Sequence, residues 1–161
     1  MDVKLHNNEG NFKFRVCAVV EQDGKYLIMS VNDKQNIMFP GGHVELNEDT
    51  ATALQREILE EVGCQVEIKK LFCVHENFYV SGNGGERFHE LAFYYHVMPI
   101  IALPKQDWDK QENDKGVLKS LHFRWVNLEQ LKDVTIYPID IKNLILQKKL
   151  DRFSHLVFKN N

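Results

Sequence analysis

The chain has 161 residues but few cysteines, few prolines and no long apolar run. Its three cysteines, Cys17, Cys64 and Cys73, are odd in number and form no CxxC pair, so we expect buried reduced thiols rather than a disulfide scaffold. No apolar segment approaches the roughly 20 residues of a membrane-spanning helix, and the segment Met1 to Asn11 is too polar for a signal peptide. These absences lead us to expect a cytoplasmic protein that does not bind a membrane.

An excess of positive charge is also absent. The chain has 20 Lys and Arg against 23 Asp and Glu, which gives a net charge of −3. This balance argues against non-specific binding to a nucleic acid polymer, so we expect a small-molecule partner. An acidic protein that binds phosphate groups would need a cationic bridge such as a metal ion. The length predicts a single domain over residues 1–161 and leaves room for a homodimer.

Hydrophobic patterning predicts strands interrupted by a few helices. Asp49 is placed to cap the start of the longest predicted helix, and Gly63 is placed to end it. Residues 81–85 predict a hairpin loop, and the long polar stretch 103–120 predicts a functional lid or local disorder. The pattern as a whole predicts an α/β fold with a mixed sheet between helices. The expected strands are 12–21, 25–31, 65–80, 87–98 and 121–126, and the expected helices are 47–62, 128–131 and 139–150.

The longest predicted helix carries three glutamates on one face. Glu57, Glu60 and Glu61 stand at i, i+3 and i+4, about a quarter turn from an apolar stripe that includes Leu54 and Ile58. Like charges at this spacing destabilise a helix by a few tenths of a kcal/mol, and the macrodipole disfavours anions at the C-terminal end. A solvated acidic face is one interpretation. The other is a divalent cation, because Mg²⁺ prefers carboxylate oxygens together with substrate phosphates.

Seven spaced residues in this region resemble the signature box of the Nudix hydrolase family, which runs here from Gly42 to Cys64. At about 7% per specified residue, a chance match anywhere in the chain is on the order of one in a million. The one departure is Cys64, where the family usually has a larger aliphatic residue. The seven residues are Gly42, Glu48, Arg56, Glu57, Glu60, Glu61 and Gly63, with Ile58 at the apolar position.

The resemblance implies a Nudix-type α/β/α sandwich that hydrolyses nucleoside diphosphates linked to another group. The reaction would be attack of metal-activated water on phosphorus, with Mg²⁺ or Mn²⁺ as the cofactor. Glu57 and Glu61, one turn apart, are placed to bind the metal. Glu60 would be a third ligand or would orient water. By resemblance the Gly41 carbonyl also faces the metal, and Gly42 lets the backbone approach the ligand.

Supporting roles follow from the same box. The resemblance implies that Arg56 pairs with a box glutamate, for which Glu48 is the candidate, and that the pair supports the site; an ordinary ion pair of little energetic value is the less favoured interpretation. A non-catalytic nucleotide sensor on the same fold is the alternative function. The intact box carboxylates favour an enzyme over a sensor.

The general base and the substrate site are less defined. A box glutamate, Glu112 in the polar stretch and Glu90 in an apolar strand are all candidates for the base. Arg15 and Arg87 could hold phosphates. Two aromatic residues, Tyr79 and Tyr137, could stack on a base, although aromatic residues in strands more often serve packing.

Overall fold

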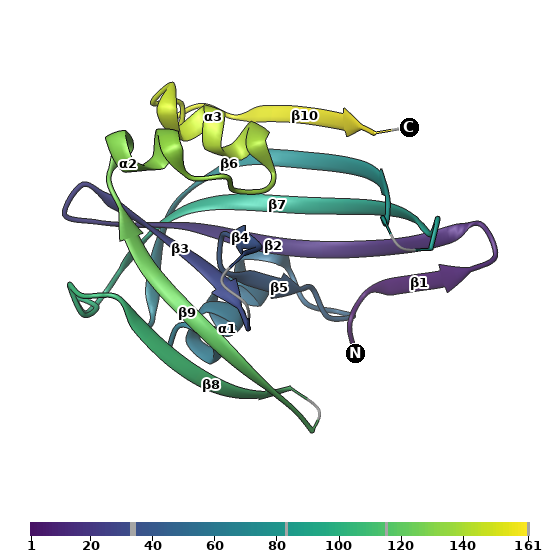
Figure 1. The fold of residues 1–161 in the computed structure, drawn as a ribbon, viewed down its shortest axis with the longest axis horizontal. Coiled ribbons are helices and arrows are strands. Elements are labelled where there is room, and N and C mark those ends of the chain that lie inside the picture. Colours follow the sequence, from purple (N-terminus) through teal and green to yellow (C-terminus); the bar gives the residue numbers. More distant parts are fainter. Residues whose placement is uncertain (33–34, 83, 115, 161) are drawn as a thin grey trace.

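A mixed β-sheet with helices on both faces forms the protein (Figure 1), as the sequence predicts. The computed structural model describes residues 1–32, 35–82, 84–114 and 116–160. The strands are β1 (Lys4–Asn7), β2 (Gly10–Gln22), β3 (Lys25–Val31), β4 (Ile37–Met38), β5 (Gly41–His43), β6 (Val66–Val80), β7 (Arg87–Pro99), β8 (Trp108–Asp114), β9 (Val117–Val126) and β10 (Ser154–Lys159). The helices are α1 (Thr50–Glu61), α2 (Leu128–Asp133) and α3 (Ile139–Leu146).

The strands follow the order β10-β6-β7-β2-β3-β9-β8, with β5 paired to the middle of β2. The pairs β10–β6 and β2–β7 are parallel, whereas β6–β7, β3–β9 and β8–β9 are antiparallel, so the sheet is mixed. Among the helices formed by the described residues, none is long and apolar enough to cross a membrane.

Side-chain alternation along β2 separates two cores, because successive residues of a strand point to opposite faces. Val16, Ala18 and Val20 pack on the face covered by α1, and Cys17 and Val19 pack on the face covered by α2 and α3. All three cysteines are free and buried, which confirms the expectation of reduced thiols.

Asp49 and Gly63 cap the two ends of helix α1, as the sequence predicts. The side chain of Asp49 accepts hydrogen bonds from the first-turn N–H groups of Ala51 and Thr52. Gly63 has a φ of +85° and donates its N–H to the carbonyl of Ile58, a conformation that glycine adopts without strain. The predicted start at residue 47 is too early, since Asn47 has a φ of +66° and cannot continue a helix.

The alternative of local disorder over 103–120 is wrong for the described residues, whereas that of a functional lid stays a prediction. The described part of this stretch contains β8, which pairs with β9 in a hairpin. Trp108 stacks on Phe123 at a centroid distance of 4.8 Å and anchors the strand to the core. The sequence hides the strand because the alternate side chains of β8 are exposed and polar. Residue 115 lies outside the described residues.

Four further strands, β1, β4, β5 and β10, escaped the sequence patterns. Gly41 and Gly42 lie in β5, in which Gly41 pairs with Cys17 and Gly42 pairs with Val16. The last predicted helix ends at Leu146 rather than at residue 150, and the chain then forms β10. Strand β1 was also missed, since all of its residues are exposed. The expected loop at 81–85 joins β6 to β7, with residue 83 outside the described residues.

Candidate active site

The loop before α1 and the last turns of α1 meet at Glu61. The backbone N–H of Gly41 donates to Oε2 of Glu61 at 2.8 Å, which ties β5 to the helix. Burial raises the pKa of the Glu61 carboxyl to about 7, and the nearby charge of Glu112 acts in the same direction. Glu61 is therefore a buried carboxylate whose charge is incompletely compensated by the protein.

Arg56 organises the acidic residues of the box. Its Nε and Nη2 donate to the two carboxylate oxygens of Glu48 at 2.9 and 2.8 Å, so the predicted pairing of these residues is confirmed. Its Nη1 donates to Oε1 of Glu57 at 2.8 Å, and Nη2 also donates to the His43 carbonyl at 3.0 Å. One guanidinium thus fixes a carboxylate from the loop, a carboxylate from α1 and the backbone of β5.

Gly42 packs directly against the carboxylate of Glu57. A Cβ at residue 42 would lie 2.1 Å from Cδ of Glu57, a separation that no side chain can adopt. The carboxylate therefore occupies the space that any other residue would fill. Burial raises the pKa of Glu57, while the hydrogen bond from Arg56 lowers it.

The three glutamates of the box differ in their surroundings. The side chain of Glu57 is 19% exposed, whereas that of Glu60 is 59% exposed. Oε2 of Glu60 lies 3.6 Å from Nη1 of Arg56. The structure therefore brings Glu57 and Glu61 to the two glycines Gly41 and Gly42 and leaves Glu60 more exposed.

Strand β8 brings Glu112 to the C-terminal end of α1. Lys110, two residues earlier on the same face of the strand, donates from Nζ to the carbonyls of Glu60 and Glu61. Both Lys110 and Glu112 are half-buried, unlike their exposed neighbour Gln111. Sequence reasoning missed Lys110, because its function in tying the hairpin to the helix depends on a strand that the pattern did not reveal.

A cavity of about 430 Å³ lies next to this cluster on the face of α3. Arg15 and Glu90 line it, and so do the predicted aromatic residues Tyr79 and Tyr137. Cys17 also lines it and is the register partner of Gly41, so the cavity adjoins the glycine pair. The structure thus gathers four residues that the sequence analysis singled out separately.

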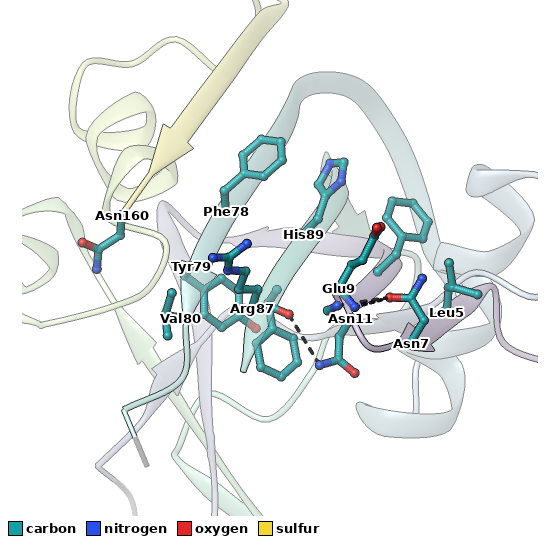
Figure 2. Close-up of a pocket in the computed structure, with 13 residues that line it drawn as sticks. Leu5, Asn7, Glu9, Asn11, Phe78, Tyr79, Val80, Arg87, His89 and Asn160 are labelled. Atoms are coloured by element: carbon teal, nitrogen blue, oxygen red, sulfur yellow. Dashed lines mark hydrogen bonds between the residues drawn. The ribbon is translucent and has the colours of Figure 1, made fainter. Parts of the chain in front are cut away.

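Arg87 lies elsewhere. It lines a second cavity of about 700 Å³ near the turn that joins β6 to β7 (Figure 2), together with Phe78 and His89. Phe78 and His89 stack at a centroid distance of 4.2 Å. Tyr79 lines both cavities, but Arg87 does not line the one next to the box.

The chemistry of the donors at the glycine pair fits a hard divalent cation. Glu57 and Glu61 supply carboxylate oxygens. Because Gly42 has no side chain, the backbone of Gly41 and Gly42 lies directly against these carboxylates. The described residues contain no group of three acidic, histidine or cysteine side chains already placed to hold a metal ion. Two carboxylates and a backbone carbonyl are the donor set expected for Mg²⁺ that also binds substrate phosphates.

Comparison with known proteins gives consistent results. A family model described as NUDIX domain matches residues 12–145. Nucleoside triphosphatase NudI of Salmonella newport (strain SL254) is 26% identical over 134 residues, which cover 78% of this chain and 87% of that protein. A MutT-like protein of Streptomyces ambofaciens is 39% identical over 60 residues, which cover 37% of this chain and only 39% of that protein.

Solved structures share the fold. A NUDIX hydrolase from Nitrosomonas europaea superposes with a TM-score of 0.66 at 16% identity, covering 96% of this chain and 82% of that one. A UDP-X diphosphatase superposes with a TM-score of 0.60 at 16% identity, covering 89% of this chain and 66% of that one. At these identities the likeness shows the fold alone.

Proposed function

Since the chain belongs to the Nudix hydrolase family, we propose that it is a pyrophosphohydrolase of nucleotides that depends on Mg²⁺ or Mn²⁺. The observation that carries the proposal is the packing of Glu57 and Glu61 against the glycine pair beside a ligand-sized cavity. Among the relatives, NudI is named as a nucleoside triphosphatase, which supports a nucleotide substrate. The intact acidic cluster supports catalysis over mere binding.

Glu57, Glu61 and the Gly41 carbonyl would hold the metal ion. A divalent cation bound there would neutralise phosphate oxygens and lower the pKa of water. Arg56 fixes Glu57 and, through Glu48 and the His43 carbonyl, fixes the loop that carries the glycines. Its role is positioning, because it contacts the acidic residues and the loop rather than the cavity.

The chemical step is attack of water on a phosphorus atom of the phosphate chain. The new P–O bond forms as the bond to the bridging oxygen breaks, and that oxygen leaves with the departing phosphate. The proton of the water passes to a carboxylate. We assign this base to Glu112, whose charge is close enough to raise the pKa of Glu61 and which β8 carries to the end of α1.

A product-resolved screen tests the proposal. Nucleoside triphosphates, dinucleoside polyphosphates, ADP-ribose and nucleotide sugars would be incubated with Mg²⁺ or Mn²⁺ and either the wild type or Glu57→Gln. We expect phosphoanhydride cleavage of at least one class by the wild type and none by the variant. If a compound raised the melting temperature but no compound were hydrolysed, this result would contradict the proposed hydrolase activity and support a nucleotide sensor.

A further inference from the structure

Arg15 is a charged side chain of the cavity next to the box whose hydrogen-bond donors the protein leaves unused. The side chain lines the cavity and is 24% exposed. Among the described residues it forms one ion pair, in which Nη1 lies 3.7 Å from Oε2 of Glu90. This separation exceeds the roughly 2.7–3.2 Å of an N–H···O hydrogen bond. The guanidinium of Arg15 therefore has no hydrogen bond to any described residue.

The other arginine near the site shows the contrast. Arg56 donates four hydrogen bonds, to Glu48, to Glu57 and to the His43 carbonyl. Among the guanidinium nitrogen atoms of Arg15, only Nε is both shielded from solvent and without a partner. Nη1 and Nη2 also lack a hydrogen bond, so they are the atoms accessible from solvent. A ligand can therefore accept hydrogen bonds from the Nη atoms of Arg15, whereas Arg56 is already occupied.

Arg15 lies close to the proposed metal site. It is on the same face of β2 as Cys17, the register partner of Gly41, and stands roughly 7 Å along the strand from it. Burial raises the pKa of the Glu61 carboxyl, and the charge of Arg15 acts in the opposite direction. The same charge opposes the effect of burial on the pKa of Glu57. The positive charge of Arg15 is therefore close enough to act on both acidic residues of the proposed metal site.

We propose that Arg15 binds the phosphate chain of the substrate, where the cavity adjoins the metal site. A guanidinium presents its N–H donors in a planar fork that matches two phosphate oxygens. The carboxylates of Glu90 and Asp140 also line the cavity, so the cavity needs a cation of its own to admit an anion. This inference rests on the proposed function and adds a substrate-binding residue to it.

Binding of methylene diphosphonate tests the inference without hydrolysis, because its phosphorus atoms are joined through carbon rather than oxygen. Calorimetry with Mg²⁺ would compare the wild type with Arg15→Gln and with the control Arg152→Gln, at an exposed arginine outside the cavity. We expect Arg15→Gln to bind about tenfold or more weakly and the control to bind normally. Equal affinity of the wild type and Arg15→Gln, or no binding to the wild type at millimolar concentration, would overturn the inference.

A double variant separates phosphate binding from a purely structural role. If Arg15 only neutralises Glu90, Arg15→Gln leaves an unpaired buried carboxylate, and adding Glu90→Gln restores the affinity of the wild type. If Arg15 holds the phosphate groups, the double variant stays about tenfold or more weaker than Glu90→Gln alone. Restored affinity in the double variant would overturn the inference.

A crystal of the unaltered protein with methylene diphosphonate gives a result even if the variants do not fold. We expect phosphonate oxygens within hydrogen-bond distance of Nη1 or Nη2 of Arg15. A diphosphonate bound in the other cavity, beside Arg87, with none at Arg15 would contradict the inference and assign phosphate binding to Arg87.

The two proposals fail in different ways. If binding of the diphosphonate depends on Arg15 but no nucleotide is hydrolysed with Mg²⁺, the phosphate-binding role of Arg15 stands and the pyrophosphohydrolase proposal fails. If nucleotides are hydrolysed with the same KM and kcat by the wild type and by Arg15→Gln, the hydrolase stands and the role of Arg15 fails.

Discussion

At the scale of single residues, the site depends on the absence of one side chain. Gly42 leaves the space in which the Glu57 carboxylate lies, with Cδ of Glu57 only 2.1 Å from where a Cβ would stand. The requirement for glycine here is steric rather than conformational. The sequence box identifies this glycine, but only the packing shows which residue it makes room for.

Gly42→Ala is expected to displace Glu57 and lower kcat/KM by about tenfold or more, because the carboxylate loses its position. Overpacking of this kind also costs roughly 1–3 kcal/mol in the free energy of unfolding. Steady-state kinetics and urea unfolding measure the two effects. Gly82→Ala, whose new Cβ would meet nothing within 4 Å, is the matched control. Unchanged kinetics in Gly42→Ala would show that the position of Glu57 is unimportant.

Removing the charge of either buried carboxylate is expected to lower kcat by about 100-fold or more while the fold stays intact. In metal-free buffer the melting temperature of Glu61→Gln should hold or rise, because an incompletely compensated buried charge is removed. Glu57→Gln should instead melt slightly lower, since it loses its ion pair with Arg56. Calorimetry and kinetics on both variants check this, and full activity in either would remove that residue from the site.

At the scale of elements, α1 was readable from the sequence and β8 was not. The caps Asp49 and Gly63 and the buried residues Leu54 and Ile58 follow local rules, so the helix could be placed within a few residues. The strand at Trp108–Asp114 depends on pairing with β9 and on the stacking of Trp108, contacts between residues distant in the chain. Propensity alone cannot report such contacts.

Lys110 joins β8 to the C-terminal end of α1, where a positive charge complements the helix dipole. Lys110→Met is expected to lower the free energy of unfolding by about 0.5–1 kcal/mol and to reduce kcat, because Glu112 loses its support. Lys105→Met, at a lysine that is 83% exposed, is the matched control. Urea unfolding and kinetics measure both. If Lys110→Met kept full kcat, β8 would not position the base.

At the scale of the whole molecule, the box supplies only part of the site. Residues 41–61 bring the acidic cluster together locally, and the sequence could name those residues because their spacing is fixed by one loop and one helix. The cavity wall comes from β2, β6, β7 and the segment before α3, which meet only in the folded sheet. Asn77, which also lines the cavity, carried no sequence signal, because this wall is assembled from distant strands.

The burial of the three cysteines in the two cores leads to a prediction about the reactivity of their thiols. Burial raises the pKa of Cys73 to about 12 and those of Cys17 and Cys64 to about 11. The folded state therefore keeps these thiols protonated. The contribution of the buried thiols to the free energy of unfolding is complete below pH 9 and is lost as the pH rises from 9 toward these pKa values.

At pH 8 an aromatic disulfide reagent is expected to react with no thiol of the native protein and with all three in urea, because only a thiolate that reaches solvent reacts. The release of the chromophore with time measures this. Rapid reaction of one thiol in the native protein would place that cysteine at the surface and contradict the packing of its core.

The most direct measurement of the central claim is mass spectrometry of nucleotide products formed in ¹⁸O-labelled water with Mg²⁺. We predict one ¹⁸O atom in a single phosphate-bearing product of the wild type, and no labelled product from Glu57→Gln. Equal labelling by both proteins, or cleavage at a bond other than a phosphoanhydride, would contradict the assignment of the acidic cluster as the site of water attack on phosphorus.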